Sequence, residues 1–143
     1  MCLGPLSAPR RVDVFFYGLF MDAELLRTKG TQPMNLRMAS VLGFALRIGK
    51  RATLISAPSS RVYGMLVELT HAEIEQLYSE PSVIAYRPEA VMADLADGSR
   101  VPALCFNLPL ASSPEEANPD YVAGLRDLGR RLGFPADYVD NIH

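Results

Sequence analysis

An apolar segment that runs into a glycine and then directly into a helix start constrains this chain most. Val14–Tyr17 is β-branched or aromatic throughout, as in a strand, and Asp22 is a good N-cap for a helix that begins at Ala23. Gly18 carries no side chain, so a ligand can approach the outward-pointing amides of the turn closely. The positive end of the following helix favours a small anionic or carbonyl-bearing ligand. The turn after Tyr17 is therefore a candidate binding site.

Composition indicates one globular domain. The chain has 143 residues, of which 49% are hydrophobic and 21% charged, with a formal net charge of −2. A chain of this length buries roughly two-thirds of its unfolded surface, so it needs neither disulfides nor metal to fold. We expect a single domain over residues 1–143, with residues 1–11 as a flexible lead-in.

The charge and hydropathy patterns restrict the partners and the compartment. A mildly acidic balance without a run of Lys or Arg argues against nucleic acid or a membrane as partner and favours a small metabolite. Met1–Pro9 lacks the apolar core of a signal peptide, and no stretch approaches the roughly 18 apolar residues of a membrane span. We therefore expect a cytoplasmic protein, monomeric or homodimeric.

The cysteines and histidines do not suggest a metal site. Cys2, Cys105, His71 and His143 show no metal-ligand spacing. Cys105 lies in an apolar run, which favours a buried structural thiol over a nucleophile, because reactive thiols need an electropositive and partly open setting.

Two tight turns predict hairpins. Gly49-Lys50 lies between expected strands at Leu36–Ile48 and Ala52–Ser56, and Asp97-Gly98 lies between strands around 91–95 and 101–106. Arg47, Lys50 and Arg51 gather at the first turn. Such charges either meet a carboxylate or are simply solvated, and at a hairpin tip solvation is the usual case.

The strand expected at Arg61–Leu69 is nearly all apolar, as a strand covered on both faces should be. Gly64 interrupts it, and a glycine inside such a strand marks a bulge or the close approach of another backbone or a ligand. Glu68 is interpreted as a strand-end residue that reaches water rather than as an acid in a cavity.

The segment that follows predicts a helix and then a carboxylate. Thr70 to Glu73 has the pattern of a capping box, so a helix begins at residue 71. It must stop at Pro81, and Glu80 is pushed toward an extended conformation just past the helix end. Glu80 is therefore the candidate acidic group.

A last helix is predicted from Asn118-Pro119 to Gly133. Its apolar residues recur at helical spacing and are assigned to the core: Tyr121, Leu125, Leu128 and Leu132.

In this order, the segments resemble the γ-glutamylcyclotransferase-like family, which includes plant avirulence-induced-gene proteins. Residues 16–21, Phe-Tyr-Gly-Leu-Phe-Met, are similar to the family's Tyr-Gly-Ser-Asn or Tyr-Gly-Thr-Leu turn. Residues 62–69 are similar to its glycine-containing central strand. Residues 70–80 and 86–89 are similar to its helix, acidic residue and Tyr-Arg strand, and residues 121–138 to the tail of several members.

The resemblance implies an α+β fold, a small twisted mixed β-barrel with surrounding helices and a cavity beside the turn. It implies a cofactor-free reaction in which a γ-glutamyl amine or peptide gives 5-oxoproline and the free amine. Glu80 matches the family's acidic position and would act as both base and acid. The substrate contacts would come from Tyr17, Gly18, Leu19, Phe20, Gly64 and Tyr86.

Two departures from the family pattern keep alternatives open. Leu19-Phe20 replaces the Ser-Asn of many relatives, and Pro81 stands where glycine often follows the acid. One alternative is a binding module that kept the cavity and lost the chemistry. Another is an acyl-transfer or amide-cleaving enzyme on the same fold that uses Cys105 or Glu68.

Overall fold

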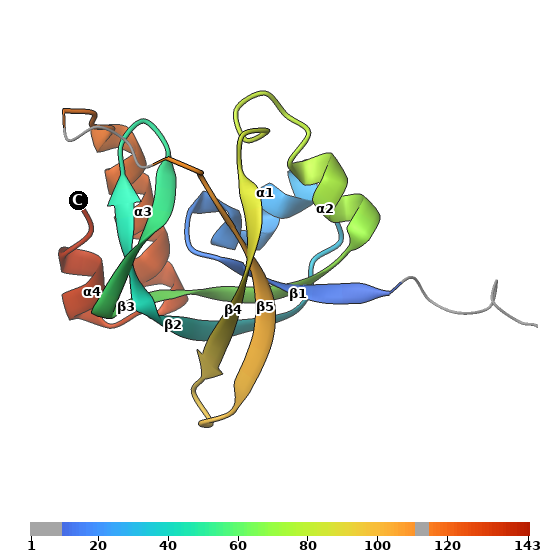
Figure 1. The fold of residues 1–143 in the computed structure, drawn as a ribbon, viewed down its shortest axis with the longest axis horizontal. Coiled ribbons are helices and arrows are strands. Elements are labelled where there is room, and N and C mark those ends of the chain that lie inside the picture. The colour runs from blue at the N-terminus through green and yellow to red at the C-terminus, as the bar shows by residue number, and fades with distance from the viewer. Residues whose placement is uncertain (1–9, 111–114) are drawn as a thin grey trace, which may run out of the picture.

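Five strands close into a barrel, and helices pack against its outside (Figure 1). The computed structural model describes residues 10–110 and 115–143. The strands are β1 (Arg11–Phe16), β2 (Met34–Ile48), β3 (Ala52–Thr70), β4 (Arg87–Leu95) and β5 (Arg100–Asn107). The helices are the 3-10 turn η2 (Leu19–Met21), α1 (Ala23–Thr28), α2 (His71–Leu77), α3 (Pro119–Leu132) and α4 (Ala136–Asp140). The expected α+β barrel with surrounding helices is confirmed; most of the expected lead-in, residues 1–9, lies outside the described residues.

The barrel has the strand order β1-β3-β2-β4-β5, and β5 returns to β1. All neighbouring strands are antiparallel except β1 and β5, which run parallel and pair at Val14 and Leu104. Because β1 lies between β3 and β5, its carboxyl end and the Gly18 turn are fixed from both sides.

In the described ranges, no helix has the length and apolar character needed to cross a membrane.

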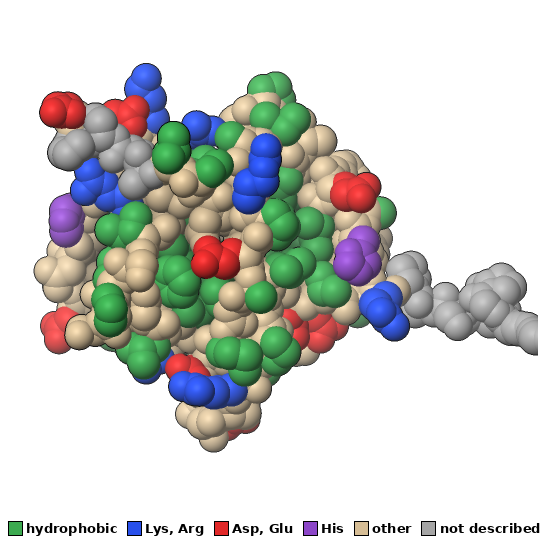
Figure 2. Space-filling view, in the orientation of Figure 1, with side chains coloured by type: hydrophobic (Ala, Val, Ile, Leu, Met, Phe, Trp, Pro, Cys, Tyr) green, Lys and Arg blue, Asp and Glu red, His purple; other side chains and the backbone are tan. Residues whose placement is uncertain are grey.

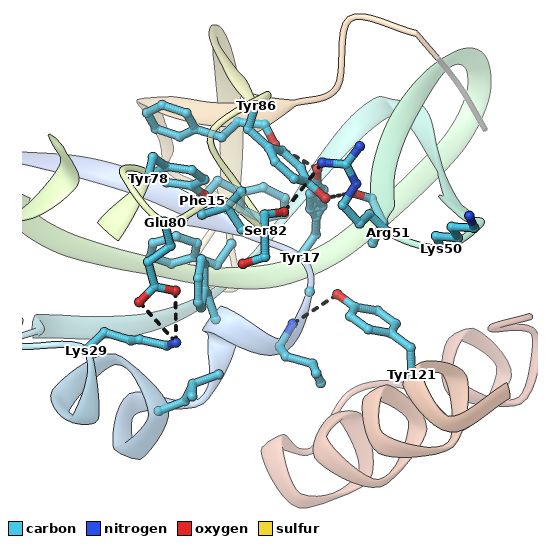
Figure 3. Close-up of a pocket in the computed structure, with 18 residues that line it drawn as sticks. Phe15, Tyr17, Lys29, Lys50, Arg51, Tyr78, Glu80, Ser82, Tyr86 and Tyr121 are labelled. Atoms are coloured by element: carbon cyan, nitrogen blue, oxygen red, sulfur yellow. Dashed lines mark hydrogen bonds and ion pairs between the residues drawn. The ribbon is translucent and has the colours of Figure 1, made fainter. Parts of the chain in front are cut away.

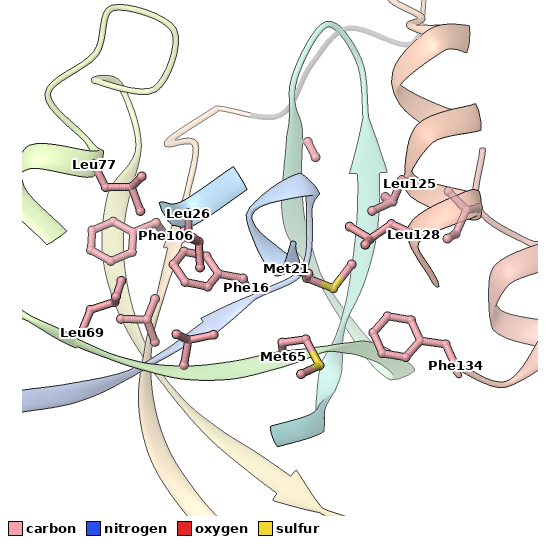
Figure 4. Packing of buried hydrophobic residues seen from close by; sticks show 14 of the residues in the cluster. Phe16, Met21, Leu26, Met65, Leu69, Leu77, Phe106, Leu125, Leu128 and Phe134 are labelled. Carbon is pink, nitrogen blue, oxygen red and sulfur yellow. The ribbon is translucent and has the colours of Figure 1, made fainter. Parts of the chain in front are cut away.

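Alternate residues of β1 point into two different hydrophobic cores. Phe15 and Tyr17 belong to a cluster drawn from all five strands, which fills the barrel. Val14 and Phe16 belong to a second cluster between the barrel and the helices, which Figure 4 shows. Burial on both faces explains why β1 and the second half of β3 are continuous apolar runs rather than alternating ones.

The two strands expected at Ala52–Ser56 and Arg61–Leu69 form one strand, β3. Its register against β2 jumps from the Leu42–Arg61 pair to the Phe44–Ser56 pair, so Gly43 alone faces residues 57–60. Gly43 has φ 96°, a backbone conformation that glycine adopts without strain. Pro58 lies among the residues 57–60 that are not paired with β2, so its missing N–H costs no ladder hydrogen bond. The strand can therefore continue through a sequence that is typical of a turn.

The capping box at the start of α2 is confirmed, with Thr70 and Glu73 exchanging side-chain-to-backbone hydrogen bonds. The predicted end at Pro81 is wrong, because α2 ends at Leu77. The hydroxyl of Ser79 donates to the carbonyl of Gln76 at 2.7 Å and closes the last turn early. Glu80 therefore lies in the turns between α2 and β4, three residues beyond the helix.

The other predicted turns and caps are confirmed. The Asp22 side chain accepts from the amide of Glu24, and that of Asn118 accepts from the amide of Tyr121. Gly133 ends α3 in the left-handed conformation, at φ 84°. On the face that Figure 2 shows, acidic and basic side chains are interspersed among apolar ones.

Candidate functional site

A cavity of about 320 Å³ opens beside the turn that links β1 to α1. Its walls come from the end of β1, η2, α1 and its C-cap, the tip of the β2–β3 hairpin, the turns after α2, and one residue each of β5 and α3 (Figure 3). Segments far apart in the sequence therefore meet here. Eight of the 18 lining residues are aromatic, and the charged ones are three cations, Lys29, Lys50 and Arg51, and one carboxylate, Glu80.

The glycine turn is held by a tyrosine from the last long helix. The amide of Leu19 donates to the Tyr121 hydroxyl at 3.3 Å. A Cβ atom added at Gly18 would lie 2.4 Å from that hydroxyl, so glycine is what allows this approach. The amides of Met21 and Asp22 close the 3-10 turn onto the carbonyls of Gly18 and Leu19. None of these hydrogen bonds uses the amide of Gly18 or Phe20.

Glu80 forms an ion pair with Lys29 at the cavity wall. The lysine Nζ donates to both carboxylate oxygens, at 3.0 and 3.2 Å, and Figure 3 shows the two side chains directed at each other. Lys29 caps the end of α1, where its carbonyl accepts from the Gln76 side chain. The carbonyl of Glu80 accepts from the amide of Val83. The pair is partly exposed, 31% for the lysine and 40% for the glutamate side chain, so it contributes about 1 kcal/mol or less.

Aromatic rings form the floor of the cavity. Tyr78 stacks on Phe106 with ring centroids 4.1 Å apart, and Phe20 meets Tyr78 edge-on at 6.0 Å. The Tyr86 hydroxyl donates to the carbonyl of Ala52, which joins the turns after α2 to the hairpin. Burial raises the pKa of Tyr86 to about 12, although the positive charge of Arg51 acts against this rise. At neutral pH these phenols are hydrogen-bond donors and not bases.

The Tyr17 hydroxyl is committed to the protein. It donates to the carbonyl of Phe106 at 2.7 Å and lies 3.0 Å from Oδ1 of Asn107, whose amide donates in turn to Glu89. Burial raises the pKa of Tyr17 far above its ordinary value. Tyr17 therefore presents its ring, rather than its hydroxyl, to a ligand.

The structure brings together six of the seven residues predicted for the site. Gly64 does not line the cavity, because it lies against β1: a Cβ there would be 2.2 Å from the Phe16 carbonyl oxygen. The six that line the cavity are Tyr17, Gly18, Leu19, Phe20, Glu80 and Tyr86.

The residues considered for other chemistries lie elsewhere. Cys105 is fully buried inside the barrel, as expected for a structural thiol, and burial raises its pKa to about 12. Glu68 accepts from the Asn35 side chain at 2.7 Å. Neither residue lines the cavity. Among the described residues, no group of three or more His, Cys, Asp or Glu side chains is placed to hold a metal ion.

Sequence reasoning missed several lining residues. The sequence around Lys29 and Tyr78 carries no signal for a site, and the helical spacing of Tyr121 assigns it to an apolar core stripe. Arg51 was noted only as a charge at a hairpin tip. Each reaches the cavity through a tertiary contact between distant segments, which periodicity does not report.

A family model described as "Gamma-glutamyl cyclotransferase, AIG2-like" matches residues 14–124. A comparison with curated proteins found no match.

Several solved structures share the fold. One is described as a γ-glutamyl cyclotransferase, with a TM-score of 0.79 and 16% identity over 93% of this chain and 86% of that chain. An uncharacterized protein from Homo sapiens has a TM-score of 0.76 and 18% identity over 92% and 86%. YkqA from Bacillus subtilis has a TM-score of 0.73 and 19% identity, and the matched region covers 92% of this chain and 52% of YkqA.

Proposed function

Because the chain belongs to the γ-glutamyl cyclotransferase, AIG2-like family, we propose that it converts a γ-glutamyl amine or peptide into 5-oxoproline and the free amine. One observation carries the proposal for this chain. The Glu80 carboxylate and the Gly18 turn border the same cavity, whose walls also carry several aromatic rings. An acid–base group and a set of backbone donors are thus available to one bound molecule.

The reaction needs little from the protein beyond positioning and proton transfer. The substrate's α-amino nitrogen attacks its own γ-carbonyl carbon, a C–N bond forms to close the five-membered ring, and the C–N bond to the amine breaks. For well-oriented intramolecular attack, effective molarities reach about 10⁵ M or more. A cavity that holds the glutamyl group bent therefore supplies much of the rate.

Glu80 would move the proton. The α-ammonium is not a nucleophile, so the carboxylate takes a proton from it and gives one to the departing amine. Before substrate binds, Lys29 holds the Glu80 carboxylate at the wall. Because this pair is weak, the substrate ammonium can replace Lys29 as the partner of Glu80.

The turn would bind negative charge. In the proposed complex, the amides of Gly18 and Phe20 face the substrate carboxylate or the oxyanion that develops on the γ-carbonyl. Tyr121 adds a further donor: its oxygen accepts from Leu19, so its own proton is left to donate to the substrate. Tyr121 thus supplies a side-chain donor at a turn whose own side chains, those of Leu19 and Phe20, supply none.

The test is 5-oxoproline release from a panel of γ-glutamyl amino acids and γ-glutamyl alkylamines. Glu80→Gln keeps the size of the side chain and removes the base, so we expect kcat to fall by about 100-fold or more. Glu75→Gln is the matched control, because Glu75 is exposed on α2 and does not line the cavity. An active Glu80→Gln variant would refute the role of Glu80.

A non-catalytic binding module is the second candidate. The observation that favours it is that both key groups are occupied, the Glu80 carboxylate by Lys29 and the Leu19 amide by Tyr121. This candidate predicts that γ-glutamyl compounds raise the melting temperature while no 5-oxoproline forms.

A further inference from the structure

Two positive side chains at the tip of the β2–β3 hairpin stand at the edge of the cavity, and no carboxylate of residues 10–110 or 115–143 forms an ion pair with them. Lys50 and Arg51 are exposed and line the cavity, and neither takes part in an ion pair of the described residues. The one carboxylate of the lining is already neutralised by Lys29. The rim near the hairpin therefore has an excess of positive charge.

Arg51 lies at the rim of the cavity, exposed to solvent and within reach of the lining. Its Nη1 donates one long hydrogen bond, 3.4 Å, to the carbonyl of Ser82 across the rim. Its charge also acts on the Tyr86 phenol in the cavity wall. In the part of the chain that the structure describes, the other donors of this guanidinium have no hydrogen-bond partner. A guanidinium in this state is suited to a planar carboxylate, which it binds through two parallel hydrogen bonds.

The position of Arg51 in the cavity indicates which part of a substrate it meets. Figure 3 shows Glu80 and Lys29 on one side of the cavity, with Arg51 and Lys50 on the other. Under the proposed function, the reacting carbonyl lies at Glu80 and the Gly18 turn, and the glutamyl group folds back on itself there. The amine portion is the part of the substrate that extends toward the hairpin.

We propose that Arg51, supported by the charge of Lys50, is a specificity-determining residue that binds a carboxylate on the leaving amine. This inference rests on the proposed function and narrows its substrate class. The preferred substrates are γ-glutamyl amino acids or peptides that carry a free carboxylate. γ-Glutamyl derivatives of neutral or cationic amines are poorer substrates. Such a substrate carries two carboxylates and one ammonium, which complements a lining of three cations and one carboxylate.

Two substrates of nearly equal size test the inference, γ-glutamyl-alanine and γ-glutamyl-alaninamide. They differ by one carboxylate in the leaving group. For the unmodified protein we expect kcat/KM to be about tenfold higher for γ-glutamyl-alanine, the range of one charge-assisted contact at a partly exposed site. In Arg51→Gln this ratio falls to near one, because the value for γ-glutamyl-alanine drops and that for the amide stays.

The control removes a positive charge from the same hairpin outside the cavity. Arg47 lies on β2 and does not line the cavity, so Arg47→Gln should keep the tenfold ratio. A ratio near one in the unmodified protein would overturn the inference. So would an Arg51→Gln variant that loses activity equally on both substrates, since Arg51 would then serve the glutamyl group or the fold.

Binding separates this inference from the proposed function. Dissociation constants of the two compounds for Glu80→Gln, measured by calorimetry, should show the same preference without turnover. If neither compound yields 5-oxoproline with the unmodified protein, the proposed reaction fails, and the ratio of dissociation constants still decides the role of Arg51. Equal affinities would reject it.

Discussion

The contact between Gly18 and Tyr121 predicts that two damaging substitutions partly cancel. Gly18→Ala places a methyl group 2.4 Å from the Tyr121 hydroxyl oxygen, while the next ring atom, Cζ, is at 3.7 Å, an ordinary contact. Gly18 has φ −109°, which alanine also adopts. The conflict therefore lies with the hydroxyl alone, and Tyr121→Phe removes it.

The magnitudes follow from these contacts. Tyr121→Phe leaves the Leu19 amide without its acceptor, at a cost of about 1 kcal/mol. Gly18→Ala displaces the hydroxyl or the turn, at about 1 to 2 kcal/mol. In the double variant the methyl group fits, and alanine also lowers the entropy of the unfolded chain, which stabilises by about 0.5 kcal/mol. The loss in the free energy of unfolding of the double variant should thus be about 1.5 kcal/mol smaller than the sum of the losses of the two single variants.

Urea unfolding followed by circular dichroism on the four proteins measures this coupling. An interaction of about 1.5 kcal/mol corresponds to roughly 5 °C in melting temperature for a chain of this size. Distant, independent sites add to within about 0.5 kcal/mol. Additive costs within that margin would show that the hydroxyl does not contact the turn.

Two further predictions concern the barrel. Gly64→Ala places its methyl group 2.2 Å from the backbone oxygen of Phe16, so we expect a loss of about 3 kcal/mol in urea unfolding; a loss below about 1 kcal/mol would contradict the close approach. The pKa of Cys105 is raised from 9.0 to about 12 by burial, so above pH 9 the unfolded thiol ionises and the folded one does not. The free energy of unfolding should therefore fall between pH 9 and 10, with this group contributing a slope that approaches about 1.4 kcal/mol per pH unit. Cys105→Ala should remove that contribution and leave the one from the buried tyrosines, whereas an equal slope in both proteins would refute the assignment.

Local chemistry made much of the fold predictable. The capping box at Thr70, the N-caps at Asp22 and Asn118 and the left-handed Gly133 are set by neighbouring residues. The two-sided burial of β1 and β3 was also readable, because continuous apolar runs need cover on both faces.

The features that the sequence did not predict depend on contacts between residues far apart in the sequence. The bulge that carries β3 past residues 57–60 requires Gly43 on the neighbouring strand. The early end of α2 depends in part on where Tyr78 packs, since its ring stacks on Phe106 of β5. Likewise the cavity residues Lys29 and Tyr121 acquire their positions only when α1 and α3 meet the Gly18 turn.

The β2–β3 hairpin carries the two positive charges at the cavity rim apart from the barrel that supports it. Lys50 and Arg51 follow the last paired residue of β2 and precede the first of β3, outside both hydrophobic cores. Exchanges at these two positions therefore leave folding nearly untouched while they alter the rim of the cavity. Substitutions at the hairpin tip can therefore change the charge at the cavity rim without altering Glu80 or the Gly18 turn.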